Sequence, residues 1–157
     1  MAKKKRSAKK RSVKRPAKKS SRTKGGAKKK PAAGLDALAR KIVRLTSLPT
    51  FGVAELKALY NDDCTSQEAG GNVDRGIAGL EKKGQRWAQM QTSTTWKATH
   101  VWVGPKSICI EWDATVNTRD GRTVKLHEVA VHEIKGGKIQ DERFYYDPNA
   151  LAPPTTA

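Results

Sequence analysis

Two residues with acid–base side chains, Glu128 and His132, lie four positions apart in the segment 124–134. Because successive side chains of a strand point to opposite faces, Glu128, Ala130 and His132 should share the face of Ile134. A carboxylate and an imidazole held in apolar surroundings can have shifted pKa values that suit proton transfer. We therefore predict that Glu128 and His132 form a general acid/base pair.

The other candidate catalytic residues are His100 and Tyr60, either of which could polarise a carbonyl or hydroxyl group. An alternative stays open, in which Glu128 and His132 are merely hydrogen-bonded side chains of a strand. The histidines His100, His127 and His132 form no metal-binding signature with nearby carboxylates. No glycine-rich segment follows a strand and opens a helix, as a phosphate-binding loop does. The sequence therefore predicts neither a metal nor a cofactor.

Four strands joined by tight turns are expected to carry most of these side chains. From Thr94 onward, apolar and polar residues alternate with a period of two, which is typical of half-buried strands. The pattern predicts strands over 95–103, 107–118, 124–134 and 138–146. Asp120-Gly121 is a strong hairpin signal, and Gly136-Gly137 marks the next turn.

The segment before these strands is expected to form three helices and a short strand. Leu35, Leu38, Ile42 and Leu45 recur at helical spacing, and a second short apolar stripe runs over 53–60. Residues 64–69 favour a short strand, and a third helical stripe runs over 77–90. Helices gathered on one face of an antiparallel sheet make an α+β domain.

The same segments resemble the nuclear transport factor 2-like superfamily, in its SnoaL-like branch, over residues 35–150. The resemblance rests on the order of elements and on five short motifs. These are Leu59-Tyr60-Asn61-Asp62-Asp63, Gly76-Ile77, the run from Glu128 to Ile134, Gly137-Lys138-Ile139 and Phe144-Tyr145-Tyr146-Asp147-Pro148.

The resemblance implies a cone, in which a curved antiparallel sheet is wrapped by three N-terminal helices around a deep pocket. Its lining is expected to include Trp87, Trp102, Trp112 and Ala130. The catalytic acid of ketosteroid isomerase has its counterpart at Ala130, so that mechanism is not carried over. The convex face, with Glu111, is where such domains often dimerise, and a homodimer is expected.

A strongly basic segment precedes this domain. Residues 1–34 hold 16 of the 32 Lys and Arg and none of the 15 acids, so the rest of the chain is close to neutral. The segment resembles the Lys/Ala/Pro-rich tails of linker histones, and it contains too few apolar residues to fold. It should bind DNA or RNA through phosphates. The expected nucleic-acid-binding residues are Lys3, Lys4, Lys5, Arg6, Lys9, Lys10, Arg11, Lys14, Arg15, Lys18 and Lys19.

Two functions therefore stay open. In the first, a disordered tail (1–34) binds nucleic acid, and the α+β domain (35–151, followed by a disordered 152–157) binds a small apolar ligand or a protein. In the second, the domain is an isomerase, cyclase or hydrolase that acts on a hydrophobic carbonyl compound. Two cysteines without paired spacing fit a reducing compartment. A cytoplasmic, nucleoid-associated location is expected in a bacterium, and a nuclear one is compatible with a eukaryote.

Overall fold

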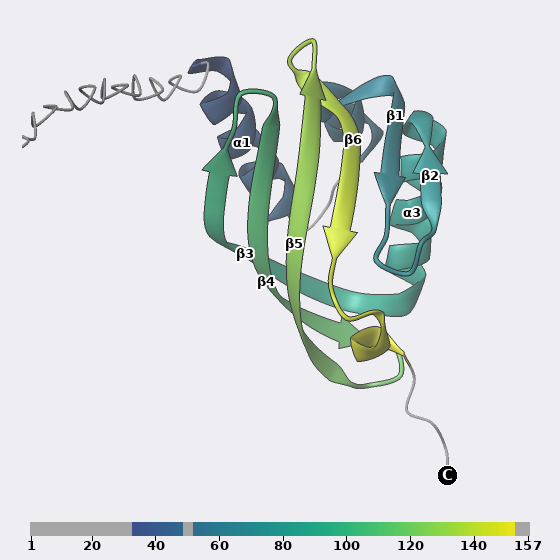
Figure 1. The fold of residues 1–157 in the computed structure, drawn as a ribbon. Coiled ribbons are helices and arrows are strands. Elements are labelled where there is room, and N and C mark those ends of the chain that lie inside the picture. Colours follow the sequence, from purple (N-terminus) through teal and green to yellow (C-terminus); the bar gives the residue numbers. More distant parts are fainter. Residues whose placement is uncertain (1–32, 49–51, 153–157) are drawn as a thin grey trace, which may run out of the picture.

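The computed structural model describes residues 33–48 and 52–152. The predictions for the basic tail and for its nucleic-acid contacts concern residues outside these ranges. The described chain forms an α+β fold of three α-helices and a six-stranded sheet (Figure 1). The elements are α1 (Ala33–Thr46), α2 (Val53–Leu59), β1 (Tyr60–Gln67), β2 (Val73–Arg75), α3 (Gly76–Met90), β3 (Gln91–Val103), β4 (Ser107–Thr118), β5 (Thr123–Lys135), β6 (Lys138–Tyr145) and the 3₁₀ helix η1 (Pro148–Leu151).

The sheet is open and curved, and the helices lie against one of its faces (Figure 1). Its strand order is β2-β1-β6-β5-β4-β3, with β1 and β6 parallel and the other neighbours antiparallel. Gly136 and Gly137 both have positive φ in the turn between β5 and β6. That backbone conformation is easily reached only by glycine.

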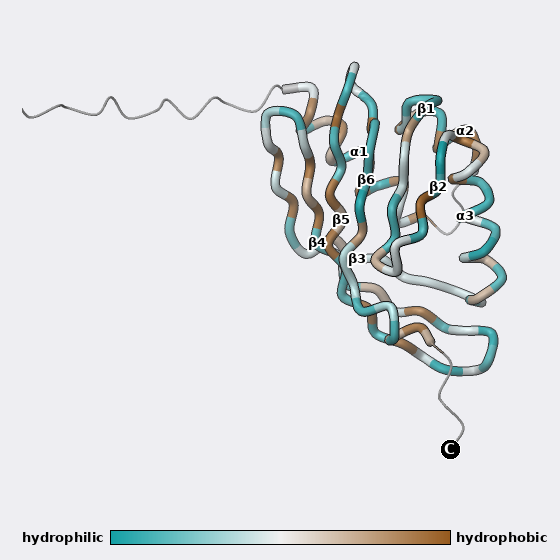
Figure 2. Tube along the Cα trace, turned by 45° about the vertical axis from the view of Figure 1, so that its right-hand side comes forward, coloured by the Kyte–Doolittle hydropathy of each residue, from teal (hydrophilic) through white to brown (hydrophobic). Residues whose placement is uncertain are grey.

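The alternation of apolar and polar residues decides which side of the sheet is buried. Every second residue of β4 is buried, and the alternation is visible along β3, β4 and β5 in Figure 2. The buried side chains pack against the apolar stripe of α1 and against Leu56 and Leu80 of the other helices. This face of the sheet, the inner face, therefore forms the core.

The predicted α+β class, the curved sheet and the three helices are confirmed. The expectation of a wholly antiparallel sheet is wrong, because β1 pairs in parallel with β6. The structure also differs in the following details. Tyr60 begins β1 instead of ending the second helix, and the three-residue β2 is an additional strand. None of the helices in the described part has the length and apolarity that a membrane crossing requires.

Candidate functional site

Strand β5 carries Glu128, Ala130 and His132 on the inner face, as the alternation predicts. All three are buried, and the exposed fractions of Glu128 and His132 are 8% and 3%. Glu128 lies opposite Trp112 of β4, and His132 lies opposite Ile108. A strand rises about 3.3 Å per residue, so the Cα atoms of Glu128 and His132 are roughly 13 Å apart, with only the small Ala130 between them.

The Glu128 carboxyl has no hydrogen bond or ion pair with any described residue. Burial raises its pKa to about 8, and the carboxylates of Glu68 and Glu142 raise it further, while Lys83 opposes the shift. A carboxyl group that loses water without gaining a partner keeps its proton, because the charged form is the one that burial disfavours. At neutral pH Glu128 is therefore an uncharged acid in the interior.

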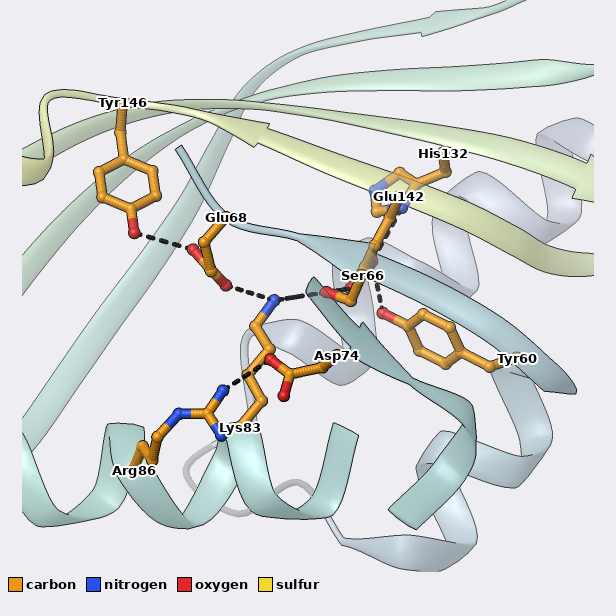
Figure 3. Close-up of polar contacts among 9 residues, drawn as sticks. All are labelled: Tyr60, Ser66, Glu68, Asp74, Lys83, Arg86, His132, Glu142 and Tyr146. Carbon is orange, nitrogen blue, oxygen red and sulfur yellow. Dashed lines mark hydrogen bonds and ion pairs between the residues drawn. The ribbon is translucent and has the colours of Figure 1, made fainter. Parts of the chain in front are cut away.

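A second buried carboxyl group, Glu142 of β6, has the opposite environment (Figure 3). Its exposed fraction is 2%. The Tyr60 hydroxyl donates to Oε2 and the Ser66 hydroxyl donates to Oε1, both at 2.7 Å. Burial alone would raise its pKa, but Lys83, His132 and Ser66 together lower the pKa to about 2. Glu142 is thus an anion on β6, the strand next to the one that carries the neutral carboxyl group of Glu128.

The ammonium group of Lys83 links Glu142 to the protein surface. Lys83 Nζ lies 3.6 Å from Oε1 of Glu142 and 2.6 Å from Oε1 of Glu68, and it donates to Ser66 Oγ at 2.8 Å. It also lies 3.8 Å from the centre of the Phe144 ring. The Tyr146 hydroxyl donates to Oε2 of Glu68 at 2.8 Å, which completes the chain of polar contacts (Figure 3).

The imidazole of His132 lies beside this anion. Its Nδ1 is 3.3 Å from Oε2 of Glu142, a contact that is close but lacks hydrogen-bond alignment. Neither ring nitrogen makes a hydrogen bond with a residue of the described part, although both are fully buried. Buried polar groups in folded proteins are nearly always paired, so the two ring nitrogens of His132 are exceptions.

Tyr60 also reaches the buried site, but its hydroxyl is already donated to Glu142. Burial raises its pKa well above the usual value, and the neighbouring Glu142 adds to the shift. The phenol therefore stays protonated and acts here as a fixed donor to the carboxylate.

The aromatic wall next to Glu128 consists of three tryptophans. Trp96 lies between Trp87 and Trp112, with ring centres 6.1 Å and 5.9 Å away. Trp112 is buried and Trp87 is partly buried. Two of the expected lining residues, Trp87 and Trp112, thus lie on the inner side together with Ala130.

The predictions for His100 and Trp102 are wrong, because both lie on the outer side of the sheet. The side chain of His100 is 64% exposed and contacts Glu111 at 2.8 Å, while Trp102 is 53% exposed and stacks on the His100 ring. The cause is an irregularity between Ala98 and His100. An extra residue at such a bulge exchanges the two faces for the rest of the strand.

Two surface depressions of the described part have no contribution from Glu128 or His132 to their walls. One, of about 280 Å³, lies where β1 and β6 end, and Glu68, Phe144 and Tyr146 form part of its wall. The other, of about 350 Å³, is lined by residues of β3, β4 and β5 that include Asp113 and His127. The first depression therefore lies at the outer end of the chain of polar contacts, where Glu68 and Tyr146 meet.

Sequence reasoning missed four members of the site: Ser66, Glu68, Lys83 and Glu142. Lys83 lies in the polar stretch of α3, and Glu142 lies in a charged stretch of β6, so both have the composition of solvent-exposed segments. Only their packing reveals them. No cluster of metal-ligating side chains occurs within residues 33–48 and 52–152.

Comparison with known proteins gives a consistent family assignment. A family model described as a SnoaL-like domain matches residues 46–142. No match was found among curated proteins.

Solved structures with a similar fold include a hypothetical protein from Catenulispora acidiphila with a ketosteroid isomerase-like fold, in complex with trimethylamine. It has 15% identity and a TM-score of 0.62, over 77% of this chain and 90% of that one. A candidate SnoaL-like polyketide cyclase from Mesorhizobium loti has 23% identity and a TM-score of 0.57, over 71% and 98% of the two chains.

Another candidate SnoaL-like polyketide cyclase, from Jannaschia sp. CCS1, has 13% identity and a TM-score of 0.65, over 76% and 94% of the two chains. At these identities the likeness of the structures shows the fold alone. The family model covers more than half of the sequence, and the chain therefore belongs to the SnoaL-like domain family.

Proposed function

We propose that the domain is an acid–base enzyme that acts on a small hydrophobic carbonyl compound, with Glu128 and His132 as the proton-transferring pair. One observation carries this proposal. Two titratable side chains are buried on one face of β5. Glu128 has no hydrogen-bond partner among the described residues, and His132 has only the 3.3 Å contact of Nδ1 with Glu142. A structural role would have supplied partners, whereas groups that handle a substrate's protons must be free to bind it.

The chemistry of the two groups assigns their roles. Glu128 is protonated at neutral pH, since its pKa is raised to about 8, so it can donate a proton to a carbonyl oxygen. His132 Nε2 can take a proton from the carbon next to that carbonyl. The C–H bond breaks, the O–H bond forms and the product is the enol, a step shared by isomerases and cyclases. Burial strengthens the hydrogen bonds of Glu128 and His132 with the substrate, because water is excluded.

The aromatic wall and the comparisons support the class of substrate. Three tryptophans beside Glu128 favour an apolar molecule. Two of the similar structures are candidate polyketide cyclases, and polyketides are carbonyl compounds.

The test is deuterium exchange of α-protons, followed by proton NMR in heavy water. The full chain would be incubated with hydrophobic ketones such as β-tetralone and cyclohexenone. We expect exchange above the buffer rate in the unaltered protein, and a loss of about 100-fold or more in E128Q and H132N. The matched control is E133Q, because Glu133 is an exposed neighbour on the same strand. Exchange that survives in E128Q and H132N would refute the pair.

A second function is favoured by the composition of residues 1–34, which hold 16 Lys and Arg and no acid. We propose that this tail binds polyanions, most simply DNA or RNA, and thereby locates the domain. Binding through phosphates should weaken as salt rises, with a slope near −0.9 per neutralised phosphate on duplex DNA. A salt titration with the full chain and with residues 35–157 tests it. Equal binding by the two chains would refute the proposal.

A further inference from the structure

We propose that Glu142 is a positioning residue, which holds the His132 imidazole with Nδ1–H toward the carboxylate and leaves Nε2 as the proton acceptor. This inference rests on the proposed role of His132 and extends it to a residue outside the acid/base pair. Carboxylate–histidine pairs, in which the carboxylate orients the imidazole, occur on several unrelated folds. Glu142 lies where the carboxylate of such a pair would lie.

The pairing of two strands brings the residues together. His132 and Glu142 are directly opposite each other in the antiparallel register of β5 and β6. Cross-strand partners on one face are about 5 Å apart at Cβ. The distance from Nδ1 to Oε2 is 3.3 Å, and the two side chains are 4% and 2% exposed. Catalytic contacts are often long in a ligand-free site and tighten when a substrate binds.

The remaining contacts of Glu142 fix the carboxylate in place. Tyr60 and Ser66 each donate to a different oxygen, and Lys83 balances the charge from 3.6 Å. Because its proton affinity is so low, Glu142 cannot exchange protons with a substrate near neutral pH. Its contribution must therefore come from its fixed charge and position.

A fixed anion at one nitrogen decides where the proton of a neutral imidazole lies. The hydrogen on Nδ1 faces the carboxylate, so the lone pair is on Nε2. That nitrogen is buried and makes no hydrogen bond with a described residue, as a base awaiting a substrate should be. When Nε2 takes up a proton, the carboxylate stabilises the resulting imidazolium.

The proposal is tested by nitrogen-15 NMR of the histidine side chains, which reports directly which ring nitrogen carries the proton. The full chain would be measured across a range of pH, with H132N to assign the signals. We expect a protonated Nδ1 and an unprotonated Nε2 in the unaltered protein, and a mixture of the two forms in E142Q. The matched control is E111Q, which removes the carboxylate from the exposed His100 and should leave the His132 signals unchanged.

If E142Q does not fold, the tautomer of His132 in the unaltered protein still decides the test, and two further variants show whether the charge of Glu142 is sufficient. Y60F and S66A each remove one hydrogen bond to Glu142 but keep its charge, so His132 should stay protonated on Nδ1. A His132 protonated on Nε2 in the unaltered protein would overturn the positioning role. In the exchange assay, E142Q should lose about tenfold or more in rate. Absence of ketone exchange together with the expected tautomer would refute the proposed function and uphold the positioning role.

Discussion

Replacing Glu128 with glutamine should change how the stability of the protein depends on pH. Glutamine has nearly the same shape and cannot ionise. In the unaltered protein Glu128 ionises near pH 4.5 when unfolded and near pH 8 when folded. Between these values the unfolded state releases a proton that the folded state retains. The free energy of unfolding therefore falls as the pH rises.

The size of the effect follows from the pKa shift. One unit corresponds to about 1.4 kcal/mol, so the rise from 4.5 to about 8 costs the folded state roughly 5 kcal/mol by pH 8. The penalty is absent below pH 4.5, grows through the interval and levels off above pH 8. E128Q should escape it, so its stability relative to the unaltered protein should rise by about this amount between pH 4.5 and pH 8.5.

Urea unfolding of both proteins, followed by tryptophan fluorescence across this pH range, measures the difference. Comparing the two proteins cancels the titration of all other groups, and E133Q serves as the control with an exposed carboxyl. The reasoning would be refuted if the stability curves of E128Q and the unaltered protein ran parallel between pH 4.5 and pH 8.5.

Three other outcomes are expected from the same contacts. E142Q should remove a pH dependence of the opposite sign, because the pKa of Glu142 is lowered to about 2. Its ionisation contributes roughly 3 kcal/mol to the free energy of unfolding above pH 4.5, and this contribution is lost as the pH falls toward 2. The acid unfolding curve of E142Q should therefore be flatter in that range. K83M should lower the free energy of unfolding by about 2 kcal/mol, because two carboxylates lose a partly buried partner. The control K82M replaces the exposed neighbouring lysine and should change the free energy little. Equal urea midpoints for the two variants would contradict this prediction. H100A should change the free energy of unfolding by less than about 0.5 kcal/mol, since the ion pair of His100 with Glu111 is exposed. A larger loss of stability in thermal unfolding would show that the outer face is more tightly packed than the structure indicates.

Alternation along regular strands allowed the faces of β4 and β5 to be predicted. Their pairing runs without interruption from Ser107 opposite Glu133 to Asn117 opposite Thr123. The period of two therefore holds throughout, and Glu128 and His132 lie on the inner face. The turns were also readable, because Gly121 and Gly137 adopt positive φ where hairpin geometry requires it.

The errors and omissions occur where the strands are irregular. In β3 the bulge after Ala98 turns His100 and Trp102 outward. The residue types around the bulge do not predict it. In β6 the register shifts between Glu133 and Ile134 of the partner strand, which helps to place Glu142 in the interior within an otherwise charged segment. The partners of Glu142 come from β1 and α3, so only the tertiary fold could identify this site.

The central claim is that Glu128 is a neutral acid in the interior at physiological pH, and its carboxyl group can be titrated directly. The chain would be labelled with carbon-13 in glutamate, and E128Q would identify the Glu128 carboxyl signal. We predict an inflection near pH 8 for this signal. An inflection below pH 5 would show that Glu128 is an ordinary carboxylate and would contradict its role as a proton donor.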